Sequence, residues 1–339
     1  MTYNITNDNI SIKKVLDLLE FYKIIFFINN ENSLVGALTN GDVRRSIEKN
    51  IDINNLVDKI INKDIIYAYI DESLEEKIKK IDLLPEDYQF LPIINRNKKL
   101  EKIVIKKDLL KKVNSVVLMA GGLGNRLGEI TKNIPKPMLH IGNKPILEII
   151  IDGFKKYHFN DFYISVNYKA DVIKKHFRNG DDFNVNIKYI NESKRLGTAG
   201  CLSLINENLN EPFFVMNGDI LTDENFEQIL NYHIKNKFEA TMCTSKYEIK
   251  IPYGVILSDA DNKIISIKEK PIQKFNINAG IYVLNPSILK YIPKDTFFDM
   301  PTLFEKLNEL NLNIGIYNLE TSWLDIGEPS DYYLAKKNK

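Results

Sequence analysis

The feature that most constrains the fold of this chain is a short apolar run that ends in a cluster of glycines. Residues 116–120 read Val-Val-Leu-Met-Ala, and Gly121, Gly122 and Gly124 follow. A run this short cannot cross a membrane, but it is typical of a parallel strand that is buried on both faces. Glycines after such a strand allow backbone N–H groups to approach an anion closely. The stretch therefore predicts a buried strand with a phosphate-binding turn at its carboxyl end.

Two cationic side chains follow the glycines. Arg126 offers a planar fork of donors that suits phosphate oxygens. Lys136 stands between Pro135 and Pro137, and because proline restricts the neighbouring backbone, the lysine extends from a stiff segment. The spacing lacks the G-x-x-x-x-G-K-[ST] pattern of a P-loop, and Leu127 stands where G-x-G-x-x-G requires its last glycine. The residues thus indicate a phosphate site of a different kind.

The composition disfavours several function classes. With 339 residues the chain is long enough for two domains, and 46 Lys+Arg against 45 Asp+Glu provide no basic surface for nucleic acid or an anionic membrane. No apolar run is long enough to span a bilayer, and the first residues do not resemble a signal peptide, so we expect a cytoplasmic protein. Cys201 and Cys243 are far apart and predict buried thiols, and the scattered histidines predict no metal site.

An internal repeat occupies the first third of the chain. Residues 27–42 can be laid without a gap on residues 93–108, and each copy predicts a strand, a turn, a second strand and a helix opened by an aspartate. An amphipathic helical pattern precedes each copy, starting near Ile12 and Leu74. We therefore expect two copies, at about residues 1–62 and 63–113, ahead of a further domain over residues 114–339.

In that further domain, predicted strands alternate with predicted helices. The strands are expected at 162–166, 186–190, 213–216 and 240–243, and two of the helices at 145–157 and 171–177. This alternation predicts a mostly parallel sheet with right-handed crossovers and ligands at the carboxyl ends of its strands. Asp219 follows one strand and Asp325 a short apolar stretch. The two carboxylates could share a Mg²⁺ ion, although each could also simply belong to a turn.

The combination G-G-x-G-x-R-L followed by P-K-P, at residues 121–127 and 135–137, resembles the signature of the sugar-1-phosphate nucleotidyltransferases. Six motifs in residues 114–339 match that family in the expected order. The resemblance implies a Rossmann-like, GT-A-like α/β domain that joins a nucleoside triphosphate to a hexose 1-phosphate and releases pyrophosphate. Because a phosphate oxygen is already nucleophilic at neutral pH, positioning and charge neutralisation would carry the catalysis.

The resemblance also implies a role for each matching residue. Arg126, Lys136 and Asp219 would be catalytic, and Mg²⁺ would be held by Asp219 and Asp325. The nucleotide would be bound by Ala120, Gly121, Gly122, Gly124, Glu192, Gly197 and Thr198. The sugar phosphate would be bound by Tyr253, Gly254, Glu269, Lys270 and Asn278. For Glu269 and Lys270 the alternative is a solvated charge run on an edge strand.

The choice of base depends on Glu192, which stands shortly before Gly-Thr-Ala-Gly where the family often reads the base edge. A carboxylate can accept both N1–H and N2–H₂ of guanine, whereas thymine and uracil present a donor and acceptors together. This favours GTP, unless Glu192 is merely a surface residue. Another nucleoside triphosphate stays open as the alternative.

The repeat resembles a pair of CBS domains, and in that family Thr39, Gly41 and Asp42 would contact an adenine nucleotide. Helix capping by Thr39 and Asp42 is the alternative, and residues 105–107 of the second copy depart from the motif. CBS pairs commonly associate, so a homo-oligomer is expected.

The joined architecture resembles the guanylyltransferases of bacterial legionaminic acid biosynthesis, which implies that GTP and glucosamine 1-phosphate give GDP-glucosamine. Synthesis of GDP-mannose, GDP-heptose, or the dTDP-, UDP- or CDP-linked glucose remains an alternative. A second alternative is a nucleotide-sensing regulatory protein whose transferase domain is inactive. The presence of both charge signs, in Arg126, Lys136, Asp219 and Asp325, argues against that second reading.

Overall fold

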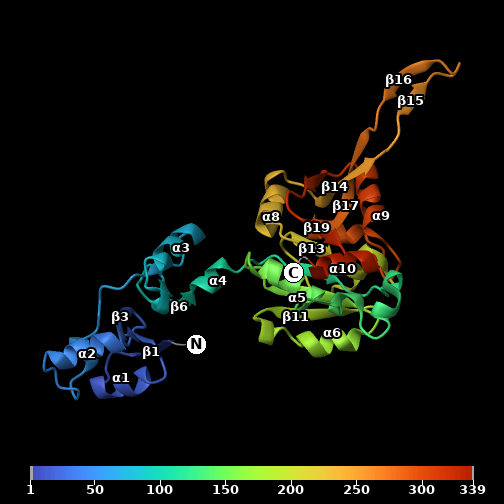
Figure 1. The fold of residues 1–339 in the computed structure, drawn as a ribbon. Coiled ribbons are helices and arrows are strands. Elements are labelled where there is room, and N and C mark those ends of the chain that lie inside the picture. The colour runs from blue at the N-terminus through green and yellow to red at the C-terminus, as the bar shows by residue number, and fades with distance from the viewer. Residues whose placement is uncertain (1–2, 338–339) are drawn as a thin grey trace. The chain divides into compact units, whose positions relative to one another are not determined.

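The computed structural model describes residues 3–337, and the chain divides into two compact units between Lys111 and Lys112. The domain boundary predicted after residue 113 lies two residues from this division. None of the helices in the described range combines the length and apolar character that a bilayer crossing requires. Figure 1 shows both units, and each is described by itself below.

The N-terminal unit contains the same β-α-β-β-α order twice. The first copy comprises β1 (Tyr3–Asn7), α1 (Ile12–Leu19), β2 (Ile24–Ile28), β3 (Leu34–Thr39) and α2 (Asn40–Glu48). The second comprises β4 (Ala68–Tyr69), α3 (Leu74–Asp82), β5 (Phe90–Ile94), β6 (Leu100–Ile105) and α4 (Lys106–Leu110). In each copy the first two strands are parallel and the last two antiparallel. β2 and β3 lie 66 residues before β5 and β6, which is the offset of the sequence repeat.

Apolar side chains from both copies form one shared core in this unit. Phe26 and Ala37 of the first copy pack in the same buried cluster as Ile94, Leu100 and Ile103 of the second. A sheet with one apolar face must bury it against another element. Here each copy buries part of the apolar face of the other copy's sheet.

The C-terminal unit is built on a seven-stranded sheet in the order β11-β10-β7-β12-β17-β14-β18. Its strands are β7 (Val116–Met119), β10 (Asp161–Val166), β11 (Asn186–Asn191), β12 (Phe213–Asn217), β14 (Ala240–Lys250), β17 (Ile272–Leu284) and β18 (Ile314–Asn318). Only β17 runs antiparallel to its neighbours. The prediction of a mostly parallel sheet is confirmed, and the antiparallel strand β17 between β12 and β14 is an addition to it.

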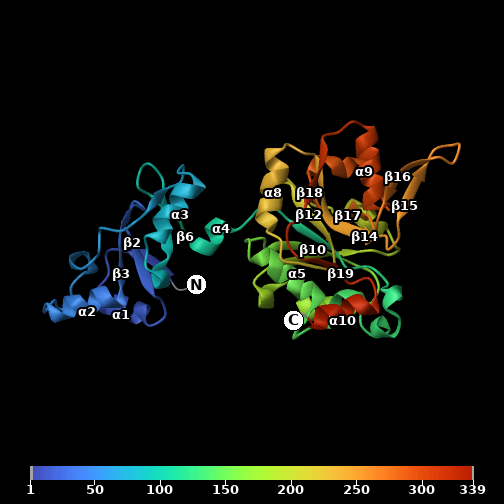
Figure 2. The ribbon, with the colours of Figure 1, turned by 45° about the horizontal axis from the view of Figure 1, so that its top comes forward.

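Helices cover both faces of this sheet (Figures 1 and 2). One apolar layer is formed with α5 (Ile146–Lys155), α6 (Ala170–Phe177), α8 (Phe226–Lys235) and α10 (Pro329–Lys337). The other is formed with α7 (Gly197–Gly200) and α9 (Met300–Glu309). Val116 and Leu118 of β7 face the first layer and Val117 faces the second, so the central strand is buried on both faces as its composition predicts.

Short strands and turns complete the unit. The strands are β8 (His140–Ile141), β9 (Lys144–Pro145), β13 (Ile220–Thr222), β15 (Val255–Ser258), β16 (Ile264–Lys268) and β19 (Trp323–Asp325). Cys201 and Cys243 are buried free thiols, which confirms the prediction for them, and burial raises the pKa of the Cys201 thiol to about 12.

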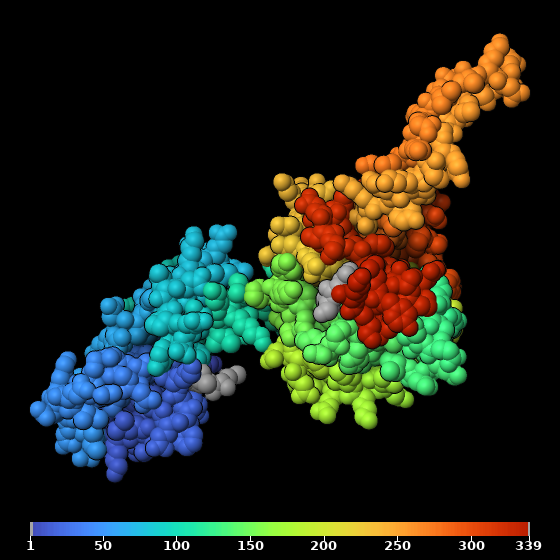
Figure 3. Space-filling view, viewed as in Figure 1, coloured from blue at the N-terminus to red at the C-terminus, as the bar shows by residue number. Residues whose placement is uncertain are grey.

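A long two-stranded extension leaves the sheet (Figures 1 and 3). β14 and β17 remain paired beyond their other neighbours, as far as Lys250 opposite Ile272. Past a short interruption, β15 and β16 pair from Val255 opposite Lys268 and end the extension in a hairpin. We refer to residues 246–276 as the arm.

Candidate active site

The loops that follow β7 and β12 meet at the carboxyl edge of the sheet. β7 and β12 are parallel neighbours, so the glycine loop after Met119 lies beside the turn that contains Gly218. The Gly218 N–H donates a hydrogen bond of 3.0 Å to the Met119 carbonyl oxygen. A Cβ at Gly218 would lie only 2.9 Å from that oxygen, so the close approach requires glycine.

Pairing of β13 with β19 brings the two predicted metal aspartates together. Ile220 lies opposite Asp325 in this ladder, and the Ile326 N–H donates a hydrogen bond of 3.1 Å to the Asp219 carbonyl oxygen. The Trp323 indole N–H also donates to the Ala279 carbonyl oxygen at 2.9 Å, which fixes β19 against the main sheet. Two carboxylates from distant parts of the chain therefore share one edge.

Lys136 extends toward these carboxylates from a short turn whose second residue is Pro137. The residue is only 7% exposed, and its Nζ lies 2.5 Å from Asp219 Oδ2 and 3.9 Å from Asp325 Oδ1. A buried ammonium group is costly unless it has a carboxylate partner, and Asp219 supplies one. The lysine between the two prolines thus forms an ion pair with Asp219.

The arrangement fits a divalent metal ion. Asp219 Oδ1 and Asp325 Oδ1 are buried and have no hydrogen-bond partner among the described residues. Burial, helped by the negative charge of Asp219, raises the pKa of Asp325 above its usual range. No cluster of three or more His, Cys, Asp or Glu side chains in residues 3–337 could hold a metal. Mg²⁺ suits such a pair, since it commonly binds one or two carboxylates and completes its shell with water and phosphate oxygens.

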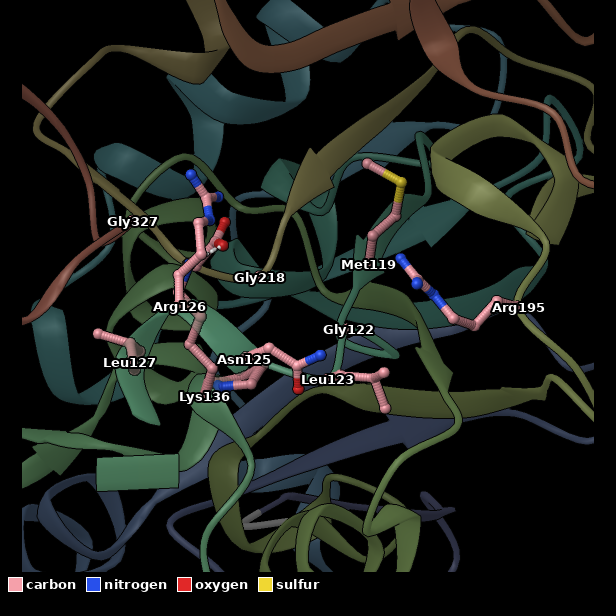
Figure 4. Close-up of a pocket in the computed structure, with 13 residues that line it drawn as sticks. Met119, Gly122, Leu123, Asn125, Arg126, Leu127, Lys136, Arg195, Gly218 and Gly327 are labelled. Atoms are coloured by element: carbon pink, nitrogen blue, oxygen red, sulfur yellow. Dashed lines mark hydrogen bonds and ion pairs between the residues drawn. The ribbon is translucent and has the colours of Figure 1, made fainter. Parts of the chain in front are cut away.

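A first cavity of about 280 Å³ opens beside this cluster (Figure 4). Its wall includes Gly122 and Gly124 of the glycine loop and three cationic side chains, Arg126, Lys136 and Arg195. Figure 4 shows Arg126 and Lys136 on one side of Gly122 and Arg195 on the other. Neither guanidinium makes a hydrogen bond or ion pair with any residue in the described range. Three cations around one cavity can neutralise a polyphosphate.

A second cavity of about 250 Å³ adjoins the first and shares part of its wall, namely Met119, Gly122, Arg195 and Asp219. Glu192 lies on this second wall. Ser165 Oγ donates to its Oε1 at 2.5 Å, and the Leu196 N–H donates to its Oε2 at 3.1 Å. A Cβ at Gly121 would lie 2.8 Å from Glu192 Oε1, so the carboxylate sits close to the glycine loop. Glu192 is therefore held in place at the cavity rather than free on the surface.

Thr198 lies in the same wall and binds a residue that the sequence analysis missed. The Thr198 N–H donates to Asp299 Oδ1 at 3.0 Å, while the Met300 N–H donates to Thr198 Oγ1 at 2.8 Å. Asp299, Asn217, Phe297 and Arg195 also line the second cavity. Arg195 could have been singled out as the cation nearest the predicted loop, but nothing in the sequence connects Asp299 with a residue about one hundred positions earlier.

The structure brings most of the predicted nucleotide-binding residues together with the predicted catalytic residues. Around the two cavities lie Gly121, Gly122, Gly124, Arg126, Lys136, Glu192, Gly197, Thr198 and Asp219. Ala120 is fully buried, and its N–H donates to the Ser165 carbonyl oxygen. It therefore fixes the start of the glycine loop to the neighbouring strand β10. Asn278 lines neither cavity, and its Nδ2 donates to the Tyr282 hydroxyl at 2.8 Å.

Four of the residues predicted to bind the sugar phosphate lie outside both cavities in this conformation, and their role stays a prediction. Tyr253, Gly254, Glu269 and Lys270 are exposed on the arm and line neither cavity. The physical reason is that β14 and β17 continue to pair with each other, so their ladder carries these residues away from the sheet. In this conformation Glu269 and Lys270 match the alternative, a solvated charge run.

Thr39 and Asp42 in the N-terminal unit form a capping box at the start of α2. Asp42 Oδ2 accepts from the Thr39 N–H at 2.8 Å and from Thr39 Oγ1 at 2.7 Å. Arg45 pairs with the other carboxylate oxygen at 2.6 Å. Helix capping, the alternative to ligand contact, therefore accounts for these side chains in this structure.

Comparison with known proteins places residues 115–339 under a family model described as Nucleotidyl transferase. A mannose-1-phosphate guanyltransferase of Yarrowia lipolytica is 35% identical over 242 residues, covering 66% of this chain and 65% of its own length. A UTP–glucose-1-phosphate uridylyltransferase of Synechocystis is 33% identical over 238 residues, covering 65% of this chain and 61% of its own length. The chain thus spans slightly less than two thirds of these curated relatives.

Among solved structures, HddC from Yersinia pseudotuberculosis is 27% identical with a TM-score of 0.53. The match covers 66% of this chain and 99% of that one. A second structure of HddC, complexed with GMP-PN, has a TM-score of 0.52 at 26% identity. The family model covers most of the C-terminal unit and does not include the N-terminal unit.

Proposed function

Since the chain belongs to the nucleotidyl transferase family, we propose that it joins GTP to a hexose 1-phosphate, giving a GDP-sugar and pyrophosphate. The observation that carries this proposal is the first cavity, where a glycine loop and three cations lie beside the pair Asp219 and Asp325. Such a set of groups suits two phosphate-bearing substrates and a divalent metal. The GMP-PN complex of HddC and the guanyltransferase relatives support GTP as the nucleotide.

Glu192 gives the choice of base a physical basis. Its carboxylate lines the second cavity and is already oriented by Ser165 and the Leu196 N–H. A carboxylate held this way has acceptor capacity left for two adjacent donors, which the guanine edge offers. The uridylyltransferase relative keeps UTP as the alternative nucleotide.

In the proposed reaction the chain's own groups position and neutralise phosphates. Arg126, Lys136 and Arg195 would balance the charge that builds on the departing pyrophosphate. Asp219 and Asp325 would hold Mg²⁺, which when bound supplies a Lewis acid for the phosphate oxygens. No general base is needed, because the sugar phosphate is ionised at neutral pH.

For the sugar we propose glucosamine 1-phosphate, on the resemblance of the whole architecture to the legionaminic acid guanylyltransferases. The mannose-1-phosphate guanyltransferase of Yarrowia lipolytica makes mannose 1-phosphate the second candidate. The test is a pyrophosphate-release assay with Mg²⁺ that crosses GTP, CTP, UTP, dTTP and ATP with the 1-phosphates of glucosamine, N-acetylglucosamine, glucose and mannose. Maximal release with GTP is expected. Maximal release with UTP or another triphosphate would contradict the base assignment. Absence of release with every pair would favour the regulatory reading or a heptose 1-phosphate, which this panel does not include.

A regulatory role for the N-terminal unit is proposed alongside catalysis. Its two β-α-β-β-α copies around a shared core are consistent with a CBS pair that binds an adenine nucleotide. Calorimetry on the full chain, with GTP saturating the catalytic cavity, tests this with ATP, ADP and AMP. Heat of binding for any of them supports the proposal, and its absence for all three contradicts it.

A further inference from the structure

Glu224 is a buried carboxylate that the proposed reaction does not use. The residue is 3% exposed and lies two positions after β13, whose ladder with β19 brings Asp219 and Asp325 together. A buried carboxylate is costly unless hydrogen bonds stabilise its charge. Here the Glu320 N–H donates to Glu224 Oε1 at 2.5 Å, and the Thr321 N–H donates to the same oxygen at 2.6 Å. The carboxylate thus joins two segments that lie 96 and 97 residues apart in the sequence.

The loop that Glu224 holds, residues 320–322, leads directly into β19. All three of its residues are exposed, so burial of their own side chains does not fix the path of the loop. Polar contacts fix it instead. Thr222 Oγ1 donates to the Ser322 carbonyl oxygen at 2.8 Å, and Ser322 Oγ donates to Asp223 Oδ2 at 3.0 Å, but both of these bonds are exposed to competing water. The two bonds to Glu224 are charge-assisted and partly shielded, and they are therefore the stronger anchor.

The position of Asp325 depends on this anchor because β19 is only three residues long. Its ladder with β13 contains three residue pairs, and a two-stranded ladder alone is at best marginally stable in water. After Asp325, the bond from the Ile326 N–H to the Asp219 carbonyl oxygen fixes the chain, and before it Glu224 does so. We propose that Glu224 is a positioning residue, whose charged hydrogen bonds hold β19 so that the Asp325 carboxylate stays beside Asp219 for a divalent metal ion. This role rests on the metal site of the proposed function.

The charge of Glu224 matters as well as its shape. Glutamine has the same shape and is less costly to bury, but its amide oxygen accepts weaker hydrogen bonds than a carboxylate. An exposed loop next to a metal site has to stay in place against water, and the stronger bonds serve that purpose. Replacement by alanine removes both bonds, whereas replacement by glutamine only weakens them. The two variants should therefore form a graded series.

Titration of the full chain with Mn²⁺ in the absence of nucleotide tests this role without using activity. Mn²⁺ suits the same oxygen ligands as Mg²⁺, and the free ion is counted by its electron paramagnetic resonance signal. Glu224→Ala is expected to raise the Kd for Mn²⁺ about 10-fold, a typical loss when a group that orients a metal ligand is removed. Glu224→Gln should raise it by a smaller factor. Asn114→Ala is the matched control, since Asn114 is 7% exposed and its Nδ2 donates to the Pro212 carbonyl oxygen at 2.7 Å, before the start of β7 and away from the carboxylates.

Trp323 provides a second readout, which reports on β19 itself and needs no metal. It is the only tryptophan in the sequence, and its indole N–H donates to the Ala279 carbonyl oxygen at 2.9 Å. Glu224→Ala should shift the Trp323 emission maximum to longer wavelength and increase its quenching by acrylamide. Asn114→Ala should leave both unchanged, because a loss of stability elsewhere does not move this strand in the folded protein.

Glu224→Gln keeps the test decisive even where Glu224→Ala does not fold, because it preserves the shape of the side chain. Wild-type Mn²⁺ affinity in Glu224→Gln would overturn the positioning role, as would a loss of affinity in Asn114→Ala as large as in the Glu224 variants. An unchanged Trp323 emission in a folded Glu224→Ala protein would also overturn it. Wild-type protein that binds no Mn²⁺ would instead overturn the metal site of the proposed function and this role with it, so the two failures differ.

Discussion

The cavities and the arm belong to one unit but depart from an ordinary protein surface in opposite ways. At the cavity, Lys136 and Asp219 withdraw opposite charges from water, at a cost that their contact offsets. On the arm, isoleucines such as Ile256 and Ile267 stay in water, where burial would be favourable. The difference indicates that the two regions bind different kinds of partner. Charged ligands suit the cavity, and an apolar surface suits the arm.

The largest effect is expected from Lys136→Ala, which leaves Asp219 without its cation and removes one positive charge from the cavity. Turnover in the pyrophosphate assay should fall about 100- to 1000-fold. Lys132→Ala is the matched control, because Lys132 is exposed and pairs with the exposed Glu129. Near-normal turnover of a well-folded Lys136→Ala protein would remove the central role assigned to the cavity.

A smaller effect is expected from Arg195→Ala. Arg195 lines both cavities and has no partner among the described residues, so its donors are free for a phosphate. Loss of a charge-assisted contact should raise KM for GTP by roughly 10- to 100-fold. Arg178→Ala serves as the control, since Arg178 is exposed and pairs with Asp182 on the surface. An unchanged KM would show that the guanidinium does not reach the nucleotide.

Asp325→Asn tests, through protein stability, whether the buried charge of Asp325 is unfavourable when no metal ion is bound. Burial raises the pKa of Asp325 in the folded state, so between its unfolded value near 4 and that raised value the folded protein binds more protons. Stability contributed by this group is therefore lost as pH rises through that window. Without Mg²⁺, the variant should be more stable than wild type at pH 7, and the difference should vanish below about pH 4.

Thermal unfolding of both proteins across that pH range measures the difference. Saturating Mg²⁺ should reverse it, because only the wild type keeps both carboxylates for the ion. A variant that is less stable than wild type at pH 7 without Mg²⁺ would contradict the assignment.

The smallest effect is expected from Ile267→Ser on the arm. In dilute protein it should change the free energy of unfolding by less than about 0.5 kcal/mol, since Ile267 is 62% exposed within its own chain. Phe214→Ala, in the core, should cost about 3–5 kcal/mol at any concentration. A destabilisation of more than about 1 kcal/mol by Ile267→Ser would contradict the exposure of this side chain.

Much of the fold could be predicted because buried parallel strands have a distinctive composition. β7 and β12 are continuous apolar runs, and both lie in the centre of the sheet. The antiparallel direction of β17 could not be predicted, because the direction of a strand depends on the connection that precedes it. The arm was missed for a related reason. Isoleucine-rich segments such as Ile264–Lys268 have the same composition whether they end inside a sheet or extend from it.

The candidate site was predictable wherever a residue lies next to a motif. Arg126 and Lys136 stand close to the glycines in the sequence, and the structure places them around the same cavity. Asp219 and Asp325 were each singled out by a local pattern, but only the pairing of β13 with β19 brings them together. Asp299 carries no local signal, because its contact with Thr198 depends on tertiary packing.

The place where the chain enters the C-terminal unit has a consequence for modular construction. The Lys112 N–H bonds to the His158 carbonyl oxygen, and β7 begins four residues later in the middle of the sheet. The chain therefore arrives at the amino edge, while the glycine loop and the carboxylates occupy the carboxyl edge. None of the described residues that line the two cavities lies at this junction. Exchange of the preceding unit at this junction, in nature or by design, therefore leaves the residues of the cavity walls unchanged.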